Sequence, residues 1–166
     1  AVSLALSRGT KCFYTTPIKA LSNQKYHDLV AEHGEDAVGL LTGDVSINSD
    51  AEIVVMTTEV LRNMIYARSR QLEALGYVVM DEVQLVGGNA AKTVALIRRE
   101  TSIAVSGTPV RRLDDLRMCL WFLGLVPSAS PTKLWQHIVS PRMAPYLAAL
   151  LAQIGIRHTK AHVAHE

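Results

Sequence analysis

Residues Tyr77–Met80 read Tyr-Val-Val-Met, an apolar run that is followed directly by an Asp-Glu pair. A strand that is covered on both faces, as in a parallel sheet, is apolar throughout instead of alternating with polar residues. The run therefore predicts a buried parallel strand. Four further short runs predict strands at Lys11–Thr15, near Ala37–Leu41, at Glu52–Met56 and at Ser102–Val105. Because helix-like segments separate these runs, the sequence predicts an α/β fold, a mostly parallel sheet with helices on both faces.

The first connecting segment carries signals for both ends of a helix. Thr16 can cap a helix whose first residue is Pro17, where the missing N–H of proline costs nothing. The helix is expected to run to about His33 and to end at Gly34.

A second helix is expected after the next strand, and the chain beyond residue 125 is expected to be a helical extension. The second helix has four apolar residues at helical spacing, which would share one face: Val60, Leu61, Met64 and Ile65. Prolines divide the extension, which begins at Val126.

Composition narrows the class of protein. A chain of 166 residues with 49% hydrophobic and 19% charged residues is an ordinary globular domain with one core. The net charge of +2 is small, so any contact with nucleic acid must come from individually placed residues. No run approaches the roughly 18 apolar residues of a membrane span. Cys12 and Cys119 lie in apolar stretches and predict buried, reduced thiols, hence an intracellular location, cytoplasmic or, in a eukaryote, nuclear.

The adjacent carboxylates Asp81 and Glu82 follow the buried strand at its carboxyl end. In open α/β sheets ligands bind at the carboxyl ends of strands, and two buried carboxylates are costly unless a cation or hydrogen bonds satisfy them. The pair suits nucleotide hydrolysis: Asp81 would hold Mg²⁺, usually through water, and Glu82 would orient or deprotonate the attacking water. The alternative is an acidic strand end that caps the following turn.

Several motifs resemble superfamily 2 helicases and translocases. Four segments, TTPIKALSNQK, LLTGD, IVVMTTEVLRNM and YVVMDEV, resemble in order and spacing the DExH RNA helicases of the exosome-assisting and antiviral group. In the second half, QLVGGNAAKTV, AVSGTPV and LDDLRMCLWFLGLVP resemble Swi/Snf-type DNA translocases. The resemblance implies the first RecA-like lobe of a motor that uses ATP and Mg²⁺, acts on RNA or DNA and has a second RecA-like lobe.

The resemblance also implies a set of residues that contact the nucleic-acid backbone. They share hydroxyls, approachable amides or positive charge at helix entrances and turns, and they are Thr16, Lys19, Thr42, Gly43, Thr57, Thr58 and Arg62. Such contacts position a strand without reading its bases. The alternatives are a helix cap at Thr16, a solvated lysine at Lys19 and an ordinary turn at Thr42-Gly43.

Three residues are implied to couple nucleotide state to lobe motion. Ser106 and Thr108 match the segment called motif III in these helicases. An ordinary strand-to-helix turn is the alternative, because such turns also favour Ser, Gly and Pro. Gln84 stands where the DExH group has histidine, and it can hydrogen-bond but not titrate. This departure favours the Swi/Snf-type resemblance. The basic pair Arg98-Arg99 is expected to be a solvated surface.

The phosphate-binding loop of these motors, Gly-x-x-x-x-Gly-Lys-Ser/Thr, does not occur in the 166 residues. We therefore expect residues 1–125 to form a partial RecA-like lobe without this loop, and residues 126–166 to lead toward a second lobe. The chain alone is expected to hydrolyse ATP negligibly. A non-catalytic nucleic-acid-binding or scaffold remnant is the alternative. A dinucleotide-dependent enzyme is disfavoured, because no Gly-x-Gly-x-x-Gly follows any strand.

Overall fold

The computed structural model describes residues 2–85, 93–94, 97–106, 119–125, 140–143, 145–146, 149 and 152. The chain divides into two compact units, residues 1–128 and residues 129–166, and every strand described below belongs to the first. Most of the helical extension expected from residue 126 onward, like Thr108, lies outside the described residues.

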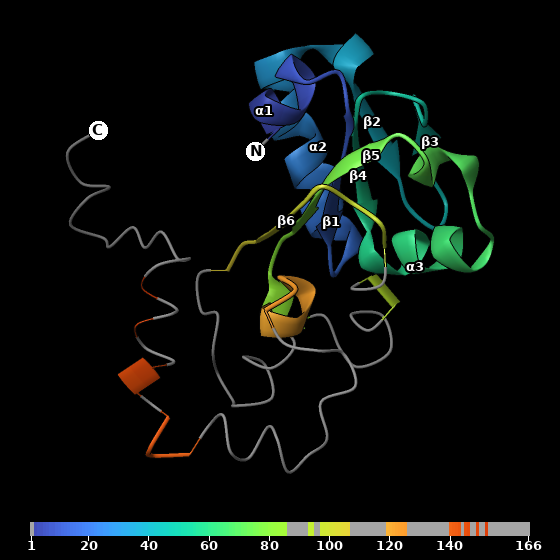
Figure 1. The fold of residues 1–166 in the computed structure, drawn as a ribbon. Coiled ribbons are helices and arrows are strands. Elements are labelled where there is room, and N and C mark those ends of the chain that lie inside the picture. Colours follow the sequence, from blue (N-terminus) through green and yellow to red (C-terminus); the bar gives the residue numbers. More distant parts are fainter. Residues whose placement is uncertain are drawn as a thin grey trace. The chain divides into compact units, whose positions relative to one another are not determined.

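The first unit is built on a six-stranded sheet with the order β3-β2-β4-β1-β5-β6 (Figure 1). The strands are β1 (Lys11–Thr16), β2 (Val38–Leu41), β3 (Ser46–Ile47), β4 (Ile53–Thr57), β5 (Leu75–Met80) and β6 (Thr101–Ala104). Every pairing is parallel except that of β3, which runs antiparallel to β2. The mostly parallel sheet is confirmed. The two-residue strand β3 was not predicted, since so short a strand has no periodicity to detect.

Helices cover both faces of this sheet, as predicted (Figure 1). They are α1 (Val2–Ser7), α2 (Lys19–His33) and α3 (Thr58–Tyr66), with short 3-10 turns η1 (Glu35–Ala37), η2 (Arg70–Leu72) and η3 (Val83–Leu85). Alternate residues of β4 show the division. Ile53 and Val55 pack in a cluster with Leu29 of α2, whereas Val54 and Met56 pack in the cluster that holds α3. The predicted apolar face of α3 lies in that second cluster.

The predicted cap of α2 is wrong, and its predicted end is right. Thr16 belongs to β1, where it pairs with Thr57 of β4, and α2 begins only at Lys19. The residue before the helix, Ile18, is extended and makes no side-chain cap. Pairing with β4 keeps the chain extended for longer than the local Thr-Pro signal indicates. Gly34 ends the helix with a φ of 89°, a left-handed backbone that glycine adopts without strain.

The thiol of Cys12 is buried in β1, and that of Cys119 is partly buried; both are free cysteines. Burial raises the pKa of Cys12 to about 11, so this thiol stays protonated and unreactive. Among the described residues, no helix has the length and apolar character needed to cross a membrane.

Candidate functional site

The carboxyl ends of five strands lie in one register row. The residues aligned across the row are Leu41, Met56, Thr15, Met80 and Ala104. The residue after each therefore lies at the same edge of the sheet, which we call the carboxyl rim: Thr42, Thr57, Thr16, Asp81 and Val105. Neighbouring strands are about 4.8 Å apart, so three strand spacings put the backbones of Thr42 and Asp81 about 14 Å from each other.

Asp81 is nearly buried on this rim, at 8% exposure, and both of its carboxylate oxygens are held. The hydroxyl of Tyr14 donates to Oδ2 at 2.9 Å, and the backbone N–H of Glu82 donates to Oδ1 at 2.9 Å. The backbone of Asp81 is fixed as well, since its N–H donates to the carbonyl oxygen of Thr15 at 2.8 Å. The carboxylate therefore has a defined orientation at the end of the central part of the sheet.

Glu82 adopts an unusual backbone conformation. Its φ is 47°, in the left-handed region that residues with a Cβ seldom occupy. Such a conformation costs on the order of 1–3 kcal/mol and is found where the surroundings impose it, often at functional sites. Immediately after Glu82, the N–H of Val83 donates to the carbonyl oxygen of Val105 at 3.3 Å. The turn that carries the acidic pair is therefore joined to the end of β6.

Two of the predicted coupling residues, Gln84 and Ser106, lie around this junction. Ser106 is partly buried and directly follows Val105, the residue whose carbonyl holds the acidic turn. Gln84 lies in η3, two residues after Glu82, and its side chain is outside the described residues. The structure thus brings Ser106 and the acidic turn to the same part of the rim.

Three predicted hydroxyls on the rim are used within the protein. Thr16 and Thr58 are buried. The Thr16 hydroxyl shares a hydrogen bond of 2.7 Å with the hydroxyl of Ser22. The Thr58 hydroxyl donates to the carbonyl oxygen of Thr16 at 3.1 Å. Thr57 Oγ1 caps α3 by accepting from the N–H of Val60 at 3.4 Å. These hydroxyls join the end of β1 to α2 and to the start of α3, and they cap α3 at the end of β4.

Lys19 and Thr42 meet at a carboxylate that the sequence did not single out. The Lys19 ammonium pairs with Oδ2 of Asp44, and Thr42 Oγ1 donates to Oδ1 of Asp44 at 3.0 Å. The hydrogen bond from Lys19, followed by that from Thr42, lowers the pKa of the exposed Asp44. Gly43 is exposed, and a Cβ placed there would meet nothing within 4 Å, so its backbone is open to approach. The three predicted residues of this loop and helix are therefore close together.

Arg62 lies in the second turn of α3. Its guanidinium donates to Oε1 of Glu59 at 2.9 Å. Its Nε is buried and has no hydrogen-bond partner among the residues that the structure describes. Arg62 therefore keeps a donor that is not satisfied within this part of the protein.

Two residues of the site were missed, Tyr14 and Asp44. Tyr14 becomes a neighbour of Asp81 through the strand register: Tyr14 pairs with Val79, and Val79 and Asp81 face the same side of the sheet. Pairing between strands that are distant in sequence is not visible in a local pattern. Asp44 could have been found from its place in the Thr-Gly-Asp turn.

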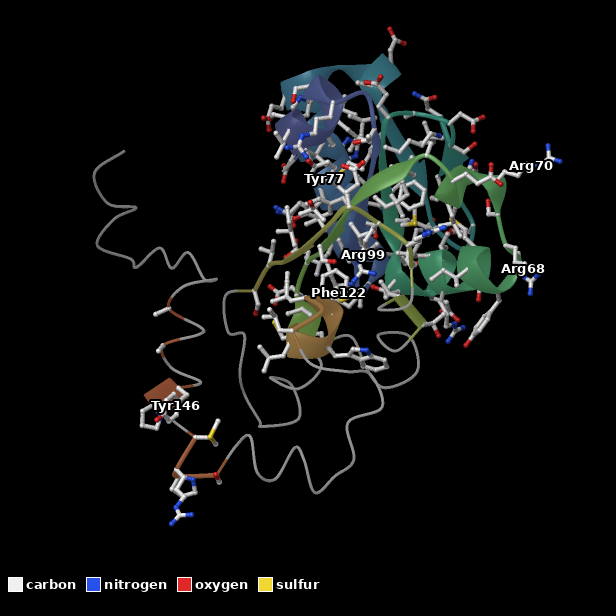
Figure 2. The ribbon with its side chains drawn as sticks, viewed as in Figure 1. Arg68, Arg70, Tyr77, Arg99, Phe122 and Tyr146 are labelled. Atoms are coloured by element: carbon white, nitrogen blue, oxygen red, sulfur yellow. The ribbon has the colours of Figure 1, made fainter. Side chains whose placement is uncertain are left out.

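The prediction that Arg98 and Arg99 are both solvated is right for Arg98 and wrong for Arg99. Arg98 is exposed, but Arg99 is partly buried and donates to the Phe122 carbonyl at 2.6 Å and to the Ile97 carbonyl at 2.8 Å (Figure 2). Its guanidinium carbon lies 4.9 Å from the centre of the Phe122 ring, a cation–π contact. Burial lowers the pKa of Arg99. Arg99 therefore links the segment before β6 to Phe122, a contact that two adjacent arginines in a sequence do not indicate.

The acidic pair fits one mode of Mg²⁺ binding. Among the described residues, no three His, Cys, Asp or Glu side chains are grouped so that they could enclose a metal ion. Mg²⁺ usually keeps several waters and is bound by one or two carboxylates together with substrate phosphates, and Asp81 with Glu82 matches that donor set. A site of this kind is formed only when a phosphate ligand is present.

Sequence comparisons give relatives for much of the chain. Residues 1–116 match the family model of the DEAD/DEAH box helicases. The chain is 66% identical over 86 residues to the probable helicase HelY of Mycobacterium tuberculosis, covering 52% of this chain and 10% of HelY. It is 52% identical over 83 residues to the ATP-dependent RNA helicase mtr4 of Schizosaccharomyces pombe, covering 50% of this chain and 7% of that helicase. The chain thus spans about a tenth or less of these relatives.

Solved structures share the fold at low identity. The SWI2/SNF2 ATPase core of Sulfolobus solfataricus, solved in complex with dsDNA, matches with a TM-score of 0.68 and 20% identity over 96% of this chain and 36% of that one. The Hef helicase domain of Pyrococcus furiosus matches with a TM-score of 0.58 and 22% identity, over 82% and 31% of the two chains. The RecA-like α/β fold and the resemblance to superfamily 2 are confirmed. Because the helicase model covers well over half of the sequence, the chain belongs to the DEAD/DEAH box helicase family.

Proposed function

We propose that this chain is part of the first RecA-like lobe of an ATP-dependent helicase or translocase. The observation that carries the proposal is the single register row, which puts the acidic pair and three of the candidate backbone-binding residues, Thr16, Thr42 and Thr57, on one edge of the sheet. Ligands of open parallel sheets bind at this edge. One rim can therefore serve ATP at Asp81 and a nucleic-acid backbone about 14 Å away at Thr42.

Asp81 and Glu82 are proposed to carry the hydrolytic chemistry. Asp81 would hold Mg²⁺ through water, and the bound ion would neutralise charge that develops on the transferred phosphate. Glu82 would orient or deprotonate the attacking water. The fixed carboxylate of Asp81 supports this role, because a preorganised group needs no reorientation during the reaction. The phosphate-binding loop and the second lobe would come from sequence outside these 166 residues.

The nucleic-acid backbone is proposed to contact the exposed side of the rim. Lys19 offers an exposed cation, Gly43 an open backbone and the partly buried Arg62 a second cation, and α2 begins without a side-chain cap. Thr57, whose hydroxyl caps α3, would contribute through the start of that helix. Such groups contact phosphates of RNA or DNA without reading sequence. Thr16 and Thr58, which are buried, would act by holding the rim in place. Ser106, together with Gln84 and Thr108, would couple the nucleotide state to the motion of the lobes.

The organisation of the chain follows from the same proposal. Residues 1–125 would form the RecA-like lobe, and residues 126–166 would lead toward the second lobe. The isolated 166-residue chain would then hydrolyse ATP negligibly, because no phosphate-binding loop is present in it to hold the triphosphate.

The test uses the intact gene product that contains this sequence. We expect ATP hydrolysis that RNA or DNA stimulates, and a loss of at least about 100-fold in Glu82→Gln, as for removal of a general base, with nucleic-acid affinity retained. Glu73→Gln is the matched control, since Glu73 precedes β5 at its opposite end and should behave as wild type. Wild-type hydrolysis that Glu82→Gln leaves unchanged would refute the assignment. Binding of nucleic acid without any hydrolysis would favour a non-catalytic scaffold.

A further inference from the structure

The structure assigns a role to a residue outside the acidic motif. We propose that Tyr14 is a positioning residue that orients the Asp81 carboxylate for metal–nucleotide binding. This inference rests on the proposed function. The two residues are 67 positions apart in sequence, and the Tyr14 hydroxyl donates to Asp81 Oδ2 at 2.9 Å.

The support for Tyr14 comes from the centre of the sheet. Tyr14 lies in β1, which is paired with β4 on one side and with β5 on the other, so its backbone is fixed at both edges. Its register partner is Val79, two residues before Asp81 on the same side of β5. Tyr14 packs against the buried cluster that contains Leu29 of α2 and Ile53 and Val55 of β4. The hydroxyl is therefore presented to the carboxylate from a rigid position.

The need for such a partner follows from the carboxylate itself. The terminal torsion of an aspartate is soft, so a carboxylate held at one oxygen can rotate. The Glu82 N–H holds Oδ1, and the Tyr14 hydroxyl holds Oδ2. Each oxygen of a carboxylate has a second lone pair, so a metal-bound water can still donate to it. The two hydrogen bonds fix the direction of the remaining lone pairs without blocking them.

The hydrogen bond between Tyr14 and Asp81 has a fixed direction. An ionised carboxylate has no proton to donate, so the tyrosine hydroxyl is the donor and Asp81 is the acceptor.

The experiment compares Tyr14→Phe with Tyr26→Phe in the intact protein. Tyr26 packs against the same apolar cluster from α2, so its variant is a matched loss of one hydroxyl. Mn²⁺ replaces Mg²⁺, and its affinity in the presence of ADP is measured by electron paramagnetic resonance. The Mg²⁺ concentration for half-maximal ATP hydrolysis is measured in parallel. We expect Tyr14→Phe to weaken both by about 5- to 10-fold, as for loss of one hydrogen bond of typical net strength, with the rate at saturating Mg²⁺ nearly unchanged.

A double-mutant comparison separates positioning from stability. Tyr14→Phe should have no further effect on Mn²⁺ affinity when Asp81 is already alanine. Equal behaviour of the Tyr14 and Tyr26 variants would overturn the inference, and so would an effect of Tyr14→Phe that persists without Asp81. Failure of Tyr14→Phe to fold while Tyr26→Phe folds would also overturn it, since the hydroxyl would then be structural. Absence of wild-type hydrolysis would instead refute the proposed function.

Discussion

The hydroxyl of Thr58 donates a hydrogen bond of 3.1 Å to the backbone carbonyl of Thr16. Both residues are buried, and each is 4% exposed or less. The bond joins the first residue of α3 to the last residue of β1, so two segments of the rim are held in a fixed relation. A hydroxyl used in this way stabilises the rim and is not free to contact a ligand.

Replacing Thr58 by valine should destabilise the protein. Valine has the shape of threonine but no hydroxyl, so the change removes the bond and leaves the Thr16 carbonyl without this donor. We expect a loss of about 1–2 kcal/mol in the free energy of unfolding, measured by urea denaturation. Thr58→Ser is the control, because it keeps the hydroxyl. A serine variant as unstable as the valine variant would show that the hydroxyl is not the cause.

Replacing Lys19 by alanine should weaken nucleic-acid binding equally for all sequences. One phosphate contact would be lost, so the slope of log affinity against log salt should fall by about 1. Asp44→Asn should tighten binding, because it removes a negative charge beside the proposed phosphate contact and releases the Lys19 ammonium. Lys25→Ala is the control on the same helix, as Lys25 pairs with Asp28. Equal effects of Lys19→Ala and Lys25→Ala would contradict the assignment.

The ion pair between Lys19 and Asp44 should persist at mildly acidic pH. The pKa of Asp44 in the folded protein is lowered, first by the hydrogen bond from Lys19. The stabilising contribution of such a carboxylate is therefore fully present above its unfolded pKa, about 3.9, and is lost as the pH falls through the folded pKa. Carboxyl NMR titration should show the pKa of Asp44 rising in Lys19→Ala and unchanged in Lys25→Ala. A pKa that stays low in Lys19→Ala would exclude Lys19 as the cause.

Arg99 and Arg98 should differ sharply on replacement by alanine. Arg99→Ala removes hydrogen bonds to the carbonyls of Phe122 and Ile97 and the contact with the Phe122 ring, so we expect a loss of about 2–3 kcal/mol. Arg98 is exposed, and its replacement should change stability by about 0.5 kcal/mol or less. Thermal and urea unfolding of the two variants give the comparison. Equal stability of both variants would show that the Arg99 contacts add nothing.

The sequence by itself determined the parts of this protein that depend on local chemistry. The apolar run at Tyr77–Met80 predicts a strand covered on both faces, and the structure buries all of β5. Gly34 ends its helix because a left-handed residue is needed there. The resemblance of the motifs was sufficient to identify the helicase family, which the family match confirms.

Only the tertiary structure decided which residues became neighbours. Thr16 was expected to cap a helix but extends a strand, because pairing with β4 outweighs a local capping preference. Asp81 meets Tyr14 because β1 and β5 pair in one particular register, and a shift of one residue would turn Tyr14 to the other face. Arg99 is held through Phe122, 23 positions away in the chain. Local sequence sets the form of each segment, whereas strand register and packing join distant segments and so build the site.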